Sequence, residues 1–182
     1  VSSTFRYRGG LAATDSLING PGYSIKFSQS QKFLLAGKIV TRDSVLLDMG
    51  WNLIGSISYP VPSNKISTVP SDIISSAFWS LKNSYIASDT VQPGVGYWVK
   101  ISDPGIAILD TQSKTAKNKE MENLFFSMDS MNSIAFNAIG GKTQKLYFTS
   151  NPSDDAATAA SKYELPPFFK DFGHFDVRFL TT

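Results

Sequence analysis

Apolar and polar residues alternate in short runs along most of the chain, which is the period expected of half-buried β-strands. Glycine and proline separate the runs, and both residues favour turns. The runs lie at residues 4–7, 22–28, 32–35, 38–40, 44–48, 50–57, 77–81, 96–102, 106–109, 123–126, 133–138, 146–148 and 175–179. A single helical turn is expected at residues 70–74, with Ser71 as its N-cap, and residues 151–161 are either a mobile loop or a short helix. The pattern predicts an all-β protein.

The run at residues 50–57 predicts a central strand, with Trp51 and Leu53 on one face and Asn52 and Ile54 on the other. The prolines at positions 60 and 62 lack the N–H group that a sheet interior requires. We therefore expect the chain to leave the sheet after this strand.

The chain also resembles itself at an offset of 74 residues, which separates Tyr23 from Tyr97. The offset needs no gap, and the exchanges between identities are conservative. Identical residues at this offset are Asp15 with Asp89, Gly20 with Gly94, Gly22 with Gly96, Lys26 with Lys100 and Ser28 with Ser102. We interpret the match as an internal duplication, because self-similarity at a fixed period indicates a structural unit used twice. The two copies are expected to superpose about a pseudo-twofold axis.

The pattern divides the chain into two consecutive β-sandwich or barrel-like units. Residues 1–110 form the first, duplicated unit, and residues 123–182 form the second, which the sequence suggests is truncated. Residues 111–122 have almost no apolar side chain, so burial cannot offset their ordering entropy and they are expected to be a linker. In the second unit we expect a turn at residues 140–141 and an extended segment at residues 164–169, where two prolines forbid a helix.

Composition excludes several classes of function. Charged residues are 18% of the chain and the formal net charge is +2, with no basic stripe that would follow nucleic acid. No apolar run approaches the roughly 18 residues of a membrane span, and the first residues are not a signal segment. The absence of cysteine excludes disulfides and thiolate chemistry and leaves the compartment open.

Two motifs carry a resemblance to a known family: Gly-Trp-Asn-Leu-Ile-Gly-Ser at residues 50–56 and Pro-Gly-Val-Gly-Tyr-Trp-Val-Lys at residues 93–100. With the segments at 145–148, 163–167 and 175–179, they resemble non-catalytic modules near the C-termini of large exported proteins of Bacteroidetes and Chlorobi-type bacteria. Such proteins often end in a type IX secretion sorting domain. The resemblance implies an extracellular or cell-surface location and a chain cut from a longer protein. Ser24 stands where the second copy has Trp98, so a ligand contact through Trp98 would not be duplicated.

Four aromatic residues are candidates for carbohydrate binding: Trp51, Trp79, Trp98 and Tyr97. An exposed aromatic ring can stack on a sugar, but strand tryptophans in a small β module more often anchor the core. Trp79 is the best surface candidate, because Phe78 is expected to take the inward position.

No metal site or cofactor is predicted. Asp15 and Asp89 precede glycine turns and are expected to cap them, although calcium is an alternative there. Asp154 and Asp155 are a weaker calcium candidate, because one acidic pair lacks the six or more oxygens that calcium takes.

No catalytic residue is predicted either. The single histidine, His174, lies in a turn, and no nucleophile elbow occurs. Asp176 and Arg178 are two residues apart, as a structural ion pair would be. The one open catalytic route is a pair of carboxylates about 5–10 Å apart.

These observations favour a non-catalytic structural or spacer module of a secreted or cell-surface bacterial protein. Its expected partners are neighbouring domains of the same polypeptide, with no nucleic acid and no membrane span. The alternative is a carbohydrate-binding accessory module that contacts a cell-surface or extracellular polysaccharide. Two coplanar, exposed rings among the four aromatic candidates would favour the alternative, and complete burial would remove its motivation.

Overall fold

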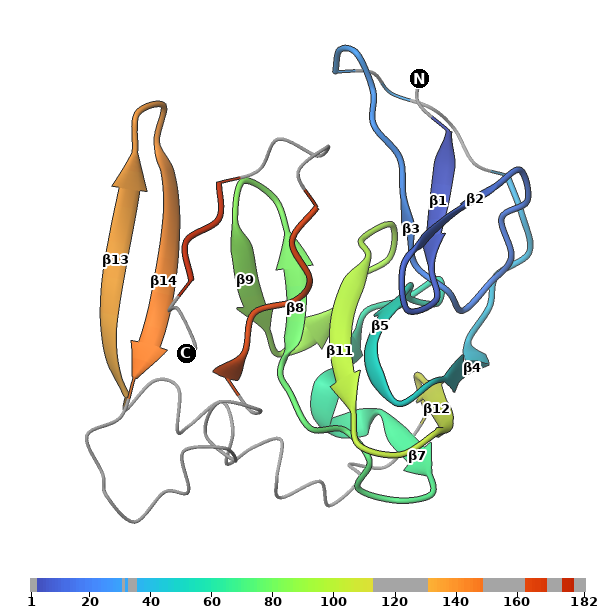
Figure 1. Cartoon of the computed structure of the whole chain (residues 1–182). Helices are drawn as coiled ribbons and strands as arrows, with labels where there is room; N and C mark the ends of the chain where they lie inside the picture. The colour runs from blue at the N-terminus through green and yellow to red at the C-terminus, as the bar shows by residue number, and fades with distance from the viewer. Residues whose placement is uncertain are drawn as a thin grey trace.

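The computed structural model describes residues 3–30, 32, 36–112, 131–148, 163–169 and 175–178. They form an all-β structure of several antiparallel sheets, which confirms the predicted fold class (Figure 1). The strands are β1 (Thr4–Tyr7), β2 (Leu11–Thr14), β3 (Tyr23–Ser24), β4 (Arg42–Leu47), β5 (Gly50–Ile54), β6 (Val61–Pro62), β7 (Ser67–Val69), β8 (Phe78–Leu81), β9 (Tyr85–Ser88), β10 (Thr90–Val91), β11 (Tyr97–Ile101), β12 (Gly105–Asp110), β13 (Asn132–Ala138) and β14 (Lys142–Phe148). A 3-10 turn, η1 (Ser63–Lys65), follows β6.

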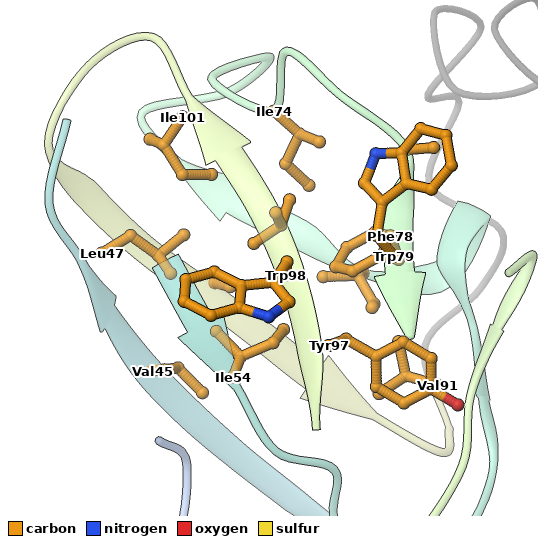
Figure 2. Close-up of a cluster of buried hydrophobic side chains, with 14 of the residues drawn as sticks. Val45, Leu47, Ile54, Ile74, Phe78, Trp79, Val91, Tyr97, Trp98 and Ile101 are labelled. Atoms are coloured by element: carbon orange, nitrogen blue, oxygen red, sulfur yellow. The ribbon is translucent and has the colours of Figure 1, made fainter. Parts of the chain in front are cut away.

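The main core is sandwich-like. A sheet of order β5-β11-β8-β9 and a sheet of order β4-β12-β7 contribute to one cluster of buried hydrophobic side chains. Alternation along β4 shows how the pattern works, because Val45 and Leu47 are buried whereas Leu46 between them is 78% exposed. Figure 2 shows Val45 and Leu47 in the same cluster as Tyr97 and Ile101 of β11. The hydrophobic period of the sequence thus defines which face of each strand enters the core.

Strand β5 has the two faces that the sequence predicts, with Asn52 and Ile54 buried, but the prediction of a central strand is wrong, because β5 lies at the edge of its sheet. The buried Asn52 side chain satisfies the turn between β4 and β5. Its Nδ2 donates to the carbonyl oxygens of Asp48 at 2.7 Å and Gly50 at 3.0 Å, and its Oδ1 accepts from the Asp48 N–H at 3.0 Å. Gly50 has a φ of +90°, which favours glycine. The Gly-Trp-Asn motif therefore stabilises the turn between β4 and β5, because Asn52 forms its hydrogen bonds and Gly50 adopts its positive φ.

The strand pairing of the N-terminal segment recurs in the main sheet at the offset of 74 residues. The hairpin β1–β2 has the same bounds and register as the hairpin β8–β9 after this shift, and β3 pairs with β1 as β11 pairs with β8. The matched pairs include Thr4↔Thr14 with Phe78↔Ser88, Tyr7↔Leu11 with Leu81↔Tyr85, and Arg6↔Tyr23 with Ser80↔Tyr97. The register match is a feature of the backbone; the duplication and its pseudo-twofold axis stay predictions.

Matching hydrogen bonds close the turns that lead into β3 and β11. The Tyr23 hydroxyl accepts from the Ile18 N–H at 3.0 Å, and the Tyr97 hydroxyl accepts from the Gln92 N–H at 3.1 Å. The two strands then differ in length, because β11 has five residues and β3 has two. The predicted strand at residues 22–28 is therefore too long in the first copy.

Two other sequence predictions are wrong. The described residues 36–40 form no strand. Residues 70–74 form no helical turn: Ile73 and Ile74 are buried, Ile74 bridges to Ile101, and the Ile73 carbonyl accepts from the Ser102 N–H at 2.9 Å. Burial of two isoleucines against β11 outweighs the local capping preference. The chain does leave the four-stranded sheet after β5, as predicted, and Pro62 then pairs with Thr90 in the separate two-stranded sheet of β10 and β6, where a missing donor is tolerated.

In the C-terminal part, β13 and β14 form the predicted hairpin, with positive φ at Gly140 and Gly141. Residues 164–169 are extended without strand pairing, as predicted, whereas residues 175–178 are not a strand. Leu146 and Leu165 belong to the same buried cluster as the main core. The described parts of the two predicted units therefore share apolar packing. The strand at 123–126, linker residues 113–122, the segment 151–161 with Asp154 and Asp155, and His174 lie outside the described residues.

Candidate functional site

Three of the four predicted sugar-binding residues lie on one face of the main sheet. Trp98 of β11 is paired directly with Trp79 of β8, and Lys100 of β11 is paired with Trp51 of β5. Because paired residues share a face and alternate residues along a strand share it too, all three indoles are on the same side. We call Trp51, Trp79 and Trp98 the tryptophan face. Tyr97 lies on the opposite side, which faces the main core.

The tryptophan face is covered. Trp79 is 1% exposed and Trp98 is 5% exposed, while Trp51 is partly buried; Tyr97 is 2% exposed. The prediction that Trp79 lies at the surface is wrong, because Phe78 and Trp79 are both buried, on opposite faces of β8 (Figure 2). The cause is that both faces of the strand are packed, a condition that alternation in sequence does not reveal.

Aromatic rings from distant parts of the chain cover Trp98. The ring of Tyr7 meets it edge-on with centroids 4.7 Å apart, and the ring of Phe169 stacks on it at 5.7 Å. Tyr7 and Phe169 also contact each other at 6.1 Å. Strand β1 and the segment 163–169 therefore meet over the tryptophan face, and Figure 1 shows this segment running across the sheet beside β8.

Tyr85 at the start of β9 attaches the C-terminal segments to the sheet. Its hydroxyl donates to the carbonyl oxygen of Pro167 at 2.7 Å, and its N–H donates to Oε1 of Gln144 in β14 at 3.1 Å. Gln144 is 1% exposed, and its Nε2 donates to the Lys145 carbonyl at 2.9 Å. Burial raises the pKa of Tyr85 above its ordinary value, the nearby Arg178 opposes the shift, and Asp176 adds to it. The hydroxyl therefore remains a donor through the neutral range.

The predicted ion pair between Asp176 and Arg178 is confirmed and has a second role. Nε and Nη2 of Arg178 each lie 2.8 Å from an Asp176 carboxylate oxygen, which is a bidentate pair. The same guanidinium donates to the carbonyl oxygen of Leu165 at 3.2 Å and to that of Pro166. Arg178 thus ties residues 175–178 to the segment that covers the tryptophan face. We call Tyr85, Gln144, Asp176 and Arg178 the latch.

A more exposed pair lies at the other end of this segment. Nζ of Lys100 is 2.6 Å from Oε2 of Glu164. Solvent screens such a pair, so it orients the segment more than it stabilises it.

Two donors on the tryptophan face have no acceptor in the part of the chain that the structure describes. The indole Nε1 atoms of Trp51 and Trp79 are buried without a hydrogen bond. A buried donor of this kind costs about 1–3 kcal/mol. The free energy gained by burying the apolar surface of the two indoles, at about 25 cal/mol per Å², is larger than this cost. The face behaves energetically as a hydrophobic core that tolerates two lost hydrogen bonds.

The predicted capping aspartates do not cap their turns. The Ser16 N–H donates to the Thr14 hydroxyl at 3.3 Å, and the Thr90 N–H donates to the Ser88 hydroxyl at 3.4 Å. The hydroxyl groups of Thr14 and Ser88, one position before each aspartate, therefore cap these turns. Within the described ranges, no group of three or more histidine, cysteine, aspartate or glutamate side chains is placed to hold a metal ion.

No protein-family model matches the chain, and no curated protein sequence or solved structure matches it either. Among the residues described, no helix is long and apolar enough to cross a membrane.

The four aromatic candidates thus form no open platform, and the residues that shape this region are the latch side chains. Only the Asp176–Arg178 pair had a sequence signal, through its spacing of two. Tyr85 and Gln144 are 59 residues apart, and nothing in the local pattern of either indicates the other. The arrangement holds segments of the described chain together.

Proposed function

We propose that this chain is a non-catalytic structural or spacer module of a secreted or cell-surface bacterial protein. The observation that carries the proposal is the latch, through which the C-terminal segments are hydrogen-bonded to a buried position of the main sheet. A spacer transmits position between the domains it joins, so it needs its own parts to be held in one arrangement. Its partners are then the neighbouring domains of the same polypeptide.

The packing supports the same proposal. Leu146 and Leu165 are 6% and 7% exposed and belong to the main hydrophobic cluster. Burying such side chains contributes about 1.5–3 kcal/mol each, and a buried tyrosine hydrogen bond adds about 1 kcal/mol. These terms favour one attached arrangement over two units that move freely.

Carbohydrate binding is the second candidate function, but fewer aromatic side chains now support it. Of the four aromatic candidates, only Trp51 retains partial exposure, while Trp79, Trp98 and Tyr97 are buried. One partly buried ring is a poor platform for a sugar, because stacking needs an open aromatic face. A binding test should therefore use Trp51→Ala, since Trp79→Ala would remove a core residue.

Thermal unfolding followed by two probes tests the spacer proposal. Tryptophan fluorescence reports the main sheet, and hydrogen exchange at β13 and β14 reports the C-terminal hairpin. A rigid spacer should lose both signals in one transition, and Arg178→Ala should separate them. Independent transitions in the unaltered chain would contradict rigidity.

A glycan array of the same chain, with Trp51→Ala as its matched control, tests the alternative. Binding that disappears in a folded Trp51→Ala variant would replace the spacer proposal with carbohydrate binding. Turnover of a polysaccharide would contradict the non-catalytic part of the proposal.

A further inference from the structure

Strand β10 follows the hairpin β8–β9 in the second of the two segments related by the offset of 74 residues, and another strand, β6, pairs with it. Val91 pairs with Val61 of β6 and is 0% exposed. Two further bonds hold the same corner: the Ser63 N–H donates to the Asp89 carbonyl at 2.7 Å, and the Ser56 hydroxyl donates to the Val91 carbonyl at 3.1 Å. An extended Val-Pro segment therefore covers this edge completely.

The matching edge of the first copy has no such cover. Leu17, which lies 74 residues before Val91, is 57% exposed, and its neighbour Ile18 is 58% exposed. Within the described part of the chain, no strand pairs with residues 15–18. Two hydrogen bonds of the turn are nevertheless the same, the one from the Ser16 N–H to the Thr14 hydroxyl and the one from the Ile18 N–H to the Tyr23 hydroxyl. Leu17 and Ile18 are thus an exposed apolar pair on a turn that resembles the buried turn at Val91. This position could accept a paired strand, as β10 accepts β6.

We propose that residues 15–18 are a docking surface for an extended segment of the β6 type, supplied by another repeat of the same unit. The internal template defines the occupant: an antiparallel segment with an aliphatic residue opposite Leu17, a proline opposite Ser16, and an N–H group that donates to the Asp15 carbonyl. This is the pairing that Val61, Pro62 and Ser63 make with β10 and Asp89. Proline suits this role because only one side of such an edge strand forms ladder bonds.

The β6 segment of a second copy of this chain is a poorer occupant. Its Val61 is 0% exposed because it already pairs with Val91 of the same chain, so swapping it would expose one aliphatic pair to cover another. A β6-type segment from a separate repeat has no such cost, because it pairs with residues 15–18 of this chain without leaving a β10 strand of its own uncovered. The inference concerns an interaction surface and does not depend on the spacer role.

A grafted chain tests the proposal. The offset places Ser75 opposite Val1, so a copy of residues 37–74 joined ahead of Val1 would supply the missing strand in the register of the second copy. Because the chain has no cysteine, Leu17→Cys reports its own accessibility through the rate of thiol labelling. We expect labelling at Leu17→Cys to slow by about tenfold or more in the grafted chain, because a covered thiol reacts only after local opening.

Two controls make the result specific. Ile39→Cys at its original position is 70% exposed and should label at the same rate with and without the graft. A graft whose copy of Val61 is replaced by Asp should leave Leu17→Cys as reactive as in the ungrafted chain. Equal labelling of Leu17→Cys with the native and the Asp-bearing graft, in chains whose circular dichroism shows folded sheet, overturns the proposal.

A peptide of residues 57–66 provides a second measurement if the graft does not fold. Added to the ungrafted chain, it should shift the amide resonances of Leu17 and Ile18 and leave those around Ile39 unchanged. Absence of shifts at millimolar peptide would also overturn the proposal.

Discussion

The segment β1–β3 and the strands β8, β9 and β11 share one pattern of backbone pairing and differ in almost everything around it. Phe5 and Trp79 occupy matched positions, yet Phe5 is half-buried and Trp79 is 1% exposed. Strands β8, β9 and β11 have the β4-β12-β7 sheet on one face and the latched segment on the other. The comparison shows that the same register occurs at two different degrees of burial, because burial depends on which elements pack against the strands.

The largest difference between the two segments should appear at Phe5 and Trp79. Trp79→Ala should lower the free energy of unfolding by about 3–5 kcal/mol, because it leaves a large cavity in a closed site. Phe5→Ala should cost about 1–2 kcal/mol, since part of its ring already contacts water. Urea unfolding monitored by circular dichroism measures both, and equal losses would mean that the first copy is covered as fully as the second.

Val91 and Leu17 offer the next contrast. Val91→Ala should cost about 2 kcal/mol, because a fully buried aliphatic group is lost between β10 and β6. Leu17→Ala should change the free energy of unfolding by about 0.5 kcal/mol or less, as expected of an exposed side chain. The midpoints of urea unfolding compare the two, and a large loss for Leu17→Ala would show that this edge is already buried in solution.

Tyr85 lies 74 residues after Leu11 and differs from it by a hydroxyl that donates a hydrogen bond to the Pro167 carbonyl. Tyr85→Phe should cost about 1–2 kcal/mol at neutral pH, because the Pro167 carbonyl loses its donor. Burial raises the pKa of Tyr85, so the folded state holds this proton more tightly than the unfolded state. Its contribution is fully present below the ordinary tyrosine pKa of about 10 and is lost as pH rises above it.

The measurement for Tyr85 is the free energy of unfolding at several pH values above 9. Tyr85→Phe should flatten the decline of the unaltered chain. Identical alkaline slopes in both proteins would show that the hydroxyl is not buried by the C-terminal segment.

The smallest expected effect concerns the tyrosines that close the two turns. Tyr97→Phe should cost about 1 kcal/mol, because the Gln92 N–H loses its acceptor beside a buried ring. Tyr23→Phe should cost only a few tenths of a kcal/mol, because water can replace the hydroxyl near the exposed Ile18. Thermal unfolding of the two variants ranks them, and the reverse order would break the comparison.

Several elements follow from the sequence alone because their causes are local. The hairpin β13–β14 was predictable from two alternating runs around Gly140 and Gly141, whose positive φ suits glycine. The two faces of β5 were predictable from the alternation around Asn52, whereas its position at the edge of the sheet was not. The Asp176–Arg178 pair was predictable from a spacing of two in an extended segment. The offset of 74 residues separates strands that pair in the same register, although β3 and β11 differ in length and the duplication stays a prediction.

Only the tertiary structure decided which of these strands would be covered. The sequence predicts Trp79 at the surface because Phe78 occupies the other face, and alternation cannot indicate that distant elements cover both faces of the same strand. The extended path at Ile73 and Ile74 follows from burial against β11, which outweighs a local helical signal. Tyr85, Gln144 and Pro167 meet through contacts across 59 and 82 residues. Local residue pattern carries turn and strand preferences, whereas burial is a property of the neighbours that the folded chain brings into contact.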